Sequence, residues 1–380
     1  MRRTVVDPRF RVVLANLVRS AGISQADLAR RAAVSPSHLS QILNGERNPS
    51  DQTARALDAA LDAGGQLTAL VTGANTDDLD RLASAVADPR RVGAPTLEAF
   101  ARILASQRRL DDLLGAAALI GPTLAQLTLV GRMVNEAVGT RRPAVLVEAG
   151  QWAQFAAWLH ISVGKFPEAR TWLSRALLWA LEAGDADLTS TILSYQAHVA
   201  WLSSQWGPAI GLAESALRTE RVYPGQHAYD AYQAARGYAA VGDLPRATRL
   251  VGTGDELAAR SNAWTGPVPA WQYYRDPWLW SLERGLVWRY AARWEPRFAR
   301  AAVTDLRAGV DGMPEEMRGA DWAAEYLVHL GQAHRRAGDR DEARAVLDRA
   351  RLVAEATHSG RVLRLVSTAE RTLRLDSPTT

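Results

Sequence analysis

Apolar residues recur at helical spacing in two short runs near the N-terminal end of the chain. The first run holds Leu28, Ala29 and Ala32, and the second holds Leu39 and Ile42. This spacing puts the members of a run on one face of a helix, where they can be buried together. The pattern predicts two short amphipathic helices in close succession.

Residues that start and stop helices delimit both runs. Ser24 stands at the N-cap position of the first helix, and Ser35, followed by Pro36, stands at that of the second. Gly45 follows the second helix, and glycine permits the left-handed backbone found at many helix C-termini. Only residues 33–34 are left for the turn. Two short helices joined in this way have the geometry that places the second helix in the major groove of DNA.

The polar residues of the second helix fall on the side opposite its apolar run. Ser37, Gln41 and Asn44 lie three or four residues apart and therefore face outward together. The amide of Gln41 can bond adenine bidentately, and Gln25 begins the first helix, whose free N–H groups can meet a phosphate. Ordinary solvation of a surface helix is the alternative explanation. The residues expected to contact DNA are Gln25, Ser35, Ser37, His38, Gln41, Asn44 and Arg47.

The stretch over residues 9–62 resembles the lambda-repressor-like, or Xre-type, DNA-binding domain. Residues 9–20 fit its first helix and residues 50–62 fit its fourth. The resemblance implies a five-helix domain over residues 1–72 that binds double-stranded DNA. The chain departs from the family at Ala33, because the family usually has glycine in this turn and alanine costs about 1 kcal/mol in a left-handed conformation. The family's base-reading positions fall here on Pro36, Ser37 and Gln41.

Four later segments share a spacing of small residues. Each has a small residue twelve before, five before and seven after a reference alanine. The reference alanines are Ala169, Ala209, Ala247 and Ala343. Small side chains at these places let antiparallel helices approach closely, with the middle one in the turn. A degenerate unit around Gly285, Trp288 and Trp294 falls before the last of the four.

The spacing resembles the tetratricopeptide repeat, a helix–turn–helix unit that stacks into a superhelix. We therefore expect an all-α chain made of three parts. The DNA-binding domain is followed by a linker with a short helix over residues 73–95. An α-solenoid over residues 96–380 follows the linker and ends in a capping helix.

In a tetratricopeptide superhelix the first helix of each repeat faces a concave groove. The residues that this register places in the groove mix aromatic rings with amides and arginines, which suits a peptide or a carboxylate-bearing small molecule. The tryptophan-rich segment 261–280 adds aromatic residues, for which filling of the core between repeats is the alternative. The residues expected to bind a ligand are Gln154, Trp158, His198, Trp201, Tyr229, Tyr232, Arg236, Trp271, Tyr274 and Gln332.

Composition removes several classes of protein. The 380 residues are 47% hydrophobic and 23% charged, as is ordinary for a folded chain of two or three domains. Cysteine is absent, so disulfides and thiolate metal sites are excluded. No phosphate loop, catalytic motif or zinc motif is present, so we expect no enzyme activity, no cofactor and no metal. No apolar run is long enough to cross a bilayer, and the protein is expected in the cytoplasm.

Net charge gives modest support for DNA binding. Residues 1–71 carry nine arginines and six acidic residues, while the whole chain has a net charge of +4. Most of the excess positive charge therefore lies on the predicted DNA-binding domain, where counterion release requires it.

Together these features predict a sequence-specific transcriptional regulator that acts as a homodimer and whose repeats bind a peptide or small-molecule effector. In outline this resembles the RRNPP-type regulators, which join such a DNA-binding domain to a repeat array that binds a signalling peptide. Ligand would change the curvature of the superhelix and with it the spacing of two DNA-binding domains. The main alternative is a tetratricopeptide scaffold that docks a partner protein, with the helix-turn-helix only localising it. A dimerisation role for the helix-turn-helix is a further alternative.

Overall fold

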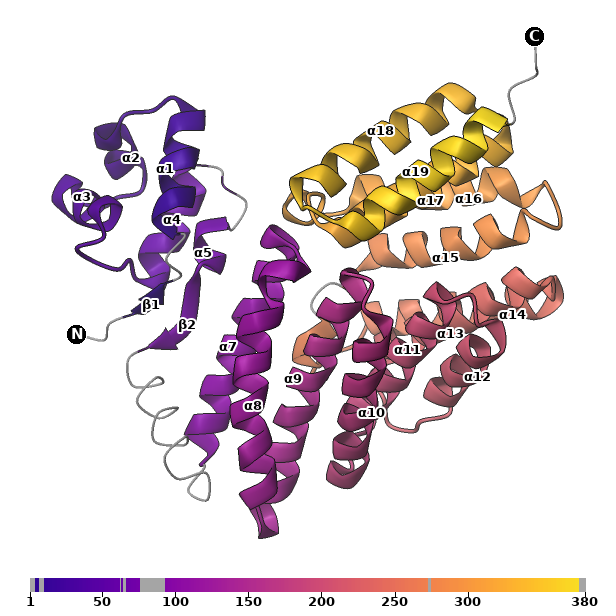
Figure 1. Cartoon of the computed structure of the whole chain (residues 1–380), viewed down its shortest axis with the longest axis horizontal. Helices are drawn as coiled ribbons and strands as arrows, with labels where there is room; N and C mark the ends of the chain where they lie inside the picture. The colour runs from indigo at the N-terminus through magenta and orange to yellow at the C-terminus, as the bar shows by residue number, and fades with distance from the viewer. Residues whose placement is uncertain are drawn as a thin grey trace. The chain divides into compact units, whose positions relative to one another are not determined.

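The computed structural model describes residues 4–6, 10–61, 63, 66–75, 93–272 and 275–375. They form two compact units, one of residues up to 113 with 125–148 and the other of residues 114–124 with 149 onward. Helices make up most of both units (Figure 1). The predicted all-α fold class is confirmed, with one small sheet added to it.

The first unit contains the predicted helix-turn-helix and the five helices expected around it. Its elements are β1 (Thr4–Val6), α1 (Phe10–Ala21), α2 (Gln25–Arg31), α3 (Pro36–Asn44), α4 (Asp51–Leu61), α5 (Gln66–Ala69), β2 (Val71–Asn75) and most of α7 (Ala94–Leu114). After α7 come the helices α8 (Ile120–Glu136) and α9 (Arg142–Ser162), with the short η3 (Gly139–Arg141) between them. Each of these two helices is divided between the two units.

The apolar positions that predicted the helices form the core of the helix-turn-helix domain. Its buried side chains, all at most 2% exposed, are Phe10, Leu14, Leu28, Ala29, Leu39, Ile42, Ala54, Leu57, Leu67 and Leu70. Asp58 ties α4 to α5, since its carboxylate accepts hydrogen bonds from the backbone N–H groups of Leu67 (2.8 Å) and Thr68 (2.6 Å). These two groups have no partner within the short helix α5, so the carboxylate satisfies them.

A two-stranded antiparallel sheet joins the beginning of the described chain to the end of this domain. β1 pairs with β2, with Thr4 opposite Asn75 and Val6 opposite Val71. The sequence did not predict this pair, because strands of three and five residues are too short for a period-two pattern to be recognised. Residues 73–75 of the predicted linker lie in β2, and the helix predicted in the linker lies outside the described residues.

The second unit is built of antiparallel helix pairs that follow one another along the chain (Figure 1). After η2 (Ala116–Ala118) and α9, its elements are α10 (Phe166–Ala183), α11 (Ala186–Leu202), α12 (Trp206–Leu217), α13 (Pro224–Val241), α14 (Leu244–Asn262), η4 (Ala270–Gln272), α15 (Pro277–Ala291), α16 (Phe298–Gly312), η5 (Glu315–Met317), α17 (Asp321–Ala337), α18 (Arg340–Ala356) and α19 (Gly360–Leu375). The degenerate unit predicted between Ala247 and Ala343 corresponds to α15 and α16. The predicted capping helix corresponds to α19.

The small residues of the repeat pattern lie where the helices of a pair turn and touch. The turn position is left-handed in all four repeats, at Gly164, Ser204, Gly242 and Gly338, with φ between +56° and +89°. The four reference alanines are all at most 3% exposed. At Gly331 a Cβ would lie 2.9 Å from the Cγ of Leu347, so a larger residue there would push α17 away from α18.

Among the described residues no helix has the length and apolar character needed to span a membrane. No group of three or more metal-ligating side chains occurs in the same part of the chain.

Candidate nucleic-acid interface and inner polar cluster

The two N-caps of the helix-turn-helix are formed as the sequence predicts. The hydroxyl oxygen of Ser24 accepts from the backbone N–H of Asp27 at 3.1 Å, and that of Ser35 accepts from His38 at 3.2 Å. Pro36 occupies the first turn of α3, and Gly45 closes the helix with φ of +77°. Each end of α3 is therefore fixed by local chemistry, which holds the helix in a defined position relative to α2.

The turn between α2 and α3 contains the left-handed residue that the sequence indicated. Ala33 has φ of +51°, and the N–H of Val34 donates to the carbonyl of Ala29 at 2.9 Å. This is the hydrogen bond of a helix end closed by a left-handed residue, a position at which glycine is usual. Alanine adopts it at a cost of about 1–2 kcal/mol, so the turn stores a small amount of strain.

The residues expected to contact DNA lie on the surface of α2, α3 and the turn after α3. Leu39 and Ile42 are 1% exposed on the inner side of α3, while Ser37 and Asn44 are exposed and His38 and Gln41 are half-buried on the outer side. Gln25, Ser35 and Arg47 are also exposed. All seven residues are thus at least partly accessible to solvent, as contact with a groove requires.

Two charged residues that the sequence reading missed adjoin this surface. The Arg11 guanidinium of α1 donates to the carbonyl of Asn44 at 3.4 Å, so a cation lies at the C-terminal end of α3, where the helix dipole favours it. A Cβ at Gly45 would meet this guanidinium, which is the end of an exposed side chain and can move aside, so the glycine is needed mainly for its left-handed backbone. Glu46 accepts from the Asn44 amide at 3.4 Å.

Electrostatics around α3 favour an uncharged histidine. Partial burial lowers the pKa of His38, and the nearby Arg47 lowers it further. Near neutral pH His38 therefore offers one donor and one acceptor nitrogen rather than a positive charge. Arg47, and not His38, therefore adds positive charge near the end of α3, where a phosphate could approach.

In the second unit, residues from five helices meet in a buried group that we call the inner polar cluster. Its members come from α11, α13, α15, α17 and α19 and are His198, Trp201, Arg236, Glu283, Arg289, Tyr290, Glu325, Tyr326, His329 and Arg361. The first helices of successive repeats contribute most of these residues. The inner faces of the repeats are therefore in contact with one another through polar and aromatic side chains.

Ion pairs and hydrogen bonds link the helices across the cluster. Arg236 Nη1 lies 3.4 Å from Glu283 Oε2, and Tyr326 donates its hydroxyl proton to the other oxygen of Glu283 at 2.5 Å. Arg361 Nη2 lies 2.8 Å from Glu325 Oε2. Arg361 also donates through Nε to the carbonyl of Ser162 at 3.0 Å, which connects α19 to the end of α9.

Trp201 lies at the centre of the aromatic contacts. Its indole N–H donates to the hydroxyl of Tyr290 at 2.9 Å, and the Arg236 guanidinium carbon lies 3.9 Å from its ring centre. The ring centres of His198 and His329 are 5.2 Å and 5.9 Å from that of Trp201. Trp201 therefore makes contact with side chains of three other helices.

Burial shifts several ionisation equilibria in the cluster. Burial lowers the pKa of His329 to about 4, and the Arg289 charge beside it acts in the same direction. Burial and Arg236 likewise lower the pKa of His198. Burial raises the pKa of Glu283 in spite of its arginine partner, whereas the Arg361 guanidinium holds the pKa of Glu325 well below its usual range against the effect of burial.

Some buried polar atoms of the cluster have no hydrogen-bond partner among the described residues. They are His198 Nδ1, Arg236 Nε, Arg289 Nε and both ring nitrogens of His329. His329 Nε2 lies 3.8 Å from Glu325 Oε1, which is beyond hydrogen-bonding distance. Native proteins leave few buried polar groups unsatisfied, so several in one place require an explanation.

Six of the residues expected to bind a ligand lie in this cluster or at its border. His198, Trp201 and Arg236 belong to it. The ring of Trp158 lies 6.5 Å from that of His198, and Gln332 accepts from Arg289 at 2.5 Å. Tyr229 is close enough to Arg236 and Tyr326 to contribute to raising the pKa of each. Trp158, Tyr229 and Gln332 each keep partial solvent exposure.

The other predicted ligand residues lie elsewhere. Tyr232 was expected in the groove, but it packs between α13, α14 and α15, where its hydroxyl donates to Asp255 at 2.6 Å and its ring stacks on Trp280. Gln154 is buried in α9. Trp271 donates to the hydroxyl of Thr191 at 3.0 Å. Tyr274 lies outside the described residues.

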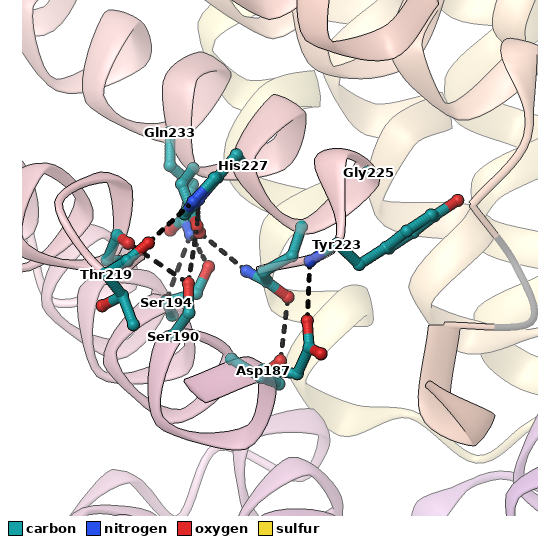
Figure 2. A network of polar contacts seen from close by, with 12 residues as sticks. Asp187, Ser190, Ser194, Thr219, Tyr223, Gly225, His227 and Gln233 are labelled. Atoms are coloured by element: carbon teal, nitrogen blue, oxygen red, sulfur yellow. Dashed lines mark hydrogen bonds and ion pairs between the residues drawn. The ribbon is translucent and has the colours of Figure 1, made fainter. Parts of the chain in front are cut away.

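Thr191 and Trp271 belong to a second buried network, around the start of α13 (Figure 2). Asp230, fully buried, accepts from Ser190 at 3.1 Å and from Gln226 at 2.8 Å. His227 donates to the carbonyl of Thr219 at 3.0 Å, as Figure 2 shows. Most donors and acceptors are matched here, with Gln272 Oε1 left as a buried atom without a partner among the described residues, so the network mainly fixes the segment after α12 against α11.

The repeat register had placed Glu325 in the groove, but nothing in the sequence indicated that Glu283, Arg289, Tyr290, Tyr326, His329 and Arg361 would join it. Three of these residues are on α15, whose repeat is degenerate and gave no register from which to place them. A buried charge cannot be recognised from a helical pattern, because the same residue would be expected on the solvent side.

Comparison with known families supports the two-part architecture. The family described as helix-turn-helix domain matches residues 9–71, and the family described as tetratricopeptide repeat matches residues 324–349. The first is typical of DNA-binding regulators and the second of protein interaction. No curated protein matches the chain. Among solved structures, the crystal structure of BtubC (BKLC) from P. vanneervenii is similar over 64% of this chain and 92% of that chain, with 17% sequence identity and a TM-score of 0.42. The chain thus combines a helix-turn-helix domain at one end with a tetratricopeptide-like repeat near the other.

Proposed function

We propose that the protein is a sequence-specific DNA-binding transcriptional regulator with an effector-binding repeat domain, and that it acts as a homodimer in the cytoplasm. The observation that carries the first part is the outer face of α3. Ser37, Gln41 and Asn44 are accessible there, opposite the buried Leu39 and Ile42. The match to a helix-turn-helix domain supports the same assignment.

Base readout in this proposal depends mainly on one side chain. Gln41 is near the middle of α3, where its amide can donate to and accept from the edge of an adenine. Pro36 has no N–H donor and offers no base contact through its side chain, so the helix reads few bases. Gln25 and the free N–H groups at the start of α2 hold a phosphate and set the orientation of α3.

Effector binding in the repeat domain would regulate the DNA-binding domains by a population shift. An effector that binds one curvature of the repeats more tightly than another favours that curvature. In a dimer, curvature sets the distance between two DNA-binding domains, which must match half-sites about one helical turn apart. The inner polar cluster supports this part of the proposal, since its contacts link helices of successive repeats.

The test of the proposal begins with selection of bound fragments from random duplexes, which yields the preferred site and its symmetry. On that site Gln41→Ala is expected to weaken binding by about 1–3 kcal/mol, or roughly 5- to 150-fold, because a bidentate base contact is lost. Gln205→Ala, an exposed glutamine of the repeat domain, is the matched control and should bind as the unaltered protein does. An equal loss on scrambled duplex would show that Gln41 makes no base contact.

A protein-interaction scaffold is the second candidate. Leu178 and Leu181 of α10 are 68% and 58% exposed, which is unusual for leucine on a repeat helix. In this reading α10 docks a partner protein and the helix-turn-helix localises the pair. Native mass spectrometry of the purified protein separates the two candidates, because a partner chain and a small effector differ in mass by orders of magnitude.

A further inference from the structure

We propose that the inner polar cluster binds a small organic molecule through a carboxylate group, with Arg289 as its charge partner and His329 as its hydrogen-bonding partner. This inference rests on the proposed sensor role of the repeat domain and names the chemistry of its ligand. It is carried by the contacts of Arg289, the unsatisfied atoms around Trp201 and the direct contacts between repeats.

Arg289 differs from the other buried arginines of the cluster in its partners. Arg236 is paired with Glu283, and Arg361 is paired with Glu325. Arg289 is only 6% exposed, yet it donates to a neutral amide, that of Gln332, and no carboxylate of the described residues lies within 4 Å of its guanidinium. Burying a charge is costly unless an opposite charge lies beside it. Arg289 has no such anion among the described residues.

The unsatisfied nitrogen atoms lie around the same place. The Arg289 guanidinium carbon is 4.1 Å from the ring centre of Tyr290, whose hydroxyl is bonded to Trp201. His329 adjoins Trp201 and feels the charge of Arg289. A ligand at this corner of the cluster would reach one uncompensated cation and the N–H of His329, since an uncharged imidazole donates from only one ring nitrogen. Its organic part would meet the aromatic rings of Trp201 and His198.

Charge favours a carboxylate over a phosphate. The guanidinium geometry matches a carboxylate bidentately, and one such group carries the single negative charge that Arg289 lacks. A phosphate carries close to two charges near neutral pH and would need a second cation. The two histidines do not supply it, since both are uncharged at that pH. A cationic ligand is disfavoured by the three arginines.

The size of the ligand follows from the contacts between repeats. Trp201 of α11 contacts Tyr290 of α15 and His329 of α17 directly. An extended peptide running along the inner faces of the helices would have to separate these rings. A molecule of a few atoms around its carboxylate could reach Arg289 without separating them.

The test uses the whole 380-residue chain without DNA and three probes of increasing size: formate, acetate and benzoate. Sodium chloride holds ionic strength constant, acetamide and benzamide serve as uncharged counterparts, and inorganic phosphate forms a separate arm. Binding is measured by the shift in melting temperature and by the change in tryptophan fluorescence. At least one carboxylate is expected to raise the melting temperature and alter the fluorescence, while its amide and phosphate do neither.

Two variants locate the binding. Arg289→Gln is expected to weaken carboxylate binding at least tenfold, and it should fold because it removes an unpaired charge without leaving a buried ion behind. Arg293→Gln is the matched control, since Arg293 lies 4.7 Å from the same Tyr290 ring but is exposed, and it should bind as the unaltered protein does. His329→Gln provides a second test of the same corner and should also weaken binding.

Three results would overturn the proposal. They are no response to any of the three carboxylates, an undiminished response in both Arg289→Gln and His329→Gln, and a response to phosphate alone. None of these bears on DNA binding, which the Gln41→Ala experiment tests independently. A protein that binds carboxylate but no duplex would contradict the regulator and leave the carboxylate site standing.

Discussion

The ion pair between Arg236 and Glu283 gives the sharpest prediction for the stability of the repeat domain. Arg236 is 1% exposed and Glu283 is 0% exposed, and their nearest charged atoms are 3.4 Å apart. In Arg236→Met the carboxylate stays buried with only the Tyr326 hydroxyl bonded to it. Breaking a buried pair by removing one partner costs about 3–5 kcal/mol, because the remaining charge is uncompensated.

The expected size of the effect can be checked by thermal and urea unfolding. In a unit of roughly 230 residues, 1 kcal/mol corresponds to about 2–4 °C, so the melting temperature should fall by about 6–20 °C. Glu283→Gln should lose a similar amount, since it leaves the arginine unpaired. The double variant should lose at least about 2 kcal/mol less than the sum of the two single variants, because neither charge then remains. Arg297→Met is the control, since Arg297 pairs with Glu295 at 2.6 Å on the surface and should cost less than about 1 kcal/mol.

The pH dependence of Arg236→Met has a defined sign. Burial already raises the pKa of Glu283 in the folded protein, and loss of the arginine raises it further. A carboxyl whose pKa is higher in the folded state than in the unfolded state stabilises the fold at low pH and loses that effect as the pH rises. The deficit of the variant relative to the unaltered protein should therefore shrink as the pH is lowered from about 8 to about 5. A loss below about 1 kcal/mol, or strict additivity in the double variant, would refute the buried pair.

Three further substitutions test individual features. Ala33→Gly should raise the free energy of unfolding of the helix-turn-helix domain by about 0.5–1 kcal/mol without changing DNA affinity, because relief of the left-handed alanine exceeds the entropy that glycine adds to the unfolded chain. A lower free energy of unfolding in urea denaturation would show that the turn is not left-handed. Asp58→Ala should lower the free energy of unfolding by about 1–3 kcal/mol in the same assay, since two N–H groups at the start of α5 lose their acceptor. An unchanged free energy of unfolding would mean that water replaces the carboxylate as acceptor. Trp201→Phe should lower the free energy of unfolding of the repeat domain by about 1–3 kcal/mol, as the Tyr290 hydroxyl loses its donor; an unaffected melting curve would place the indole outside the cluster.

Features set by a few neighbouring residues could be predicted from the sequence. The N-caps Ser24 and Ser35, the C-terminal Gly45 and the left-handed Ala33 all depend on local backbone chemistry, and each was placed correctly. The same holds for the small residues in the repeat turns, including Ser204, which adopts the conformation that glycine has in the other three.

Features that depend on distant segments could not be predicted. The β1–β2 pair joins strands at the two ends of the first domain, and Arg11 reaches α3 from another helix. Tyr232 was assigned to the groove because the repeat register gives a helix face only to within part of a turn, and its side chain lies on the neighbouring interface. The charged residues of α15 were not found because its repeat has lost the pattern that would have given a register. Whether any of the proposed residues bind DNA or ligand stays a prediction.

The bond from Arg361 to the carbonyl of Ser162 joins residues 199 positions apart. In an open stack of repeats each unit touches only its neighbours, so terminal units can fray or be deleted without harm to the middle. A bond between the first and last helices of the array removes that freedom, because loss of α19 also releases α9. This domain should therefore unfold as one cooperative block, and it should fold slowly, since its two ends must find each other across most of the chain.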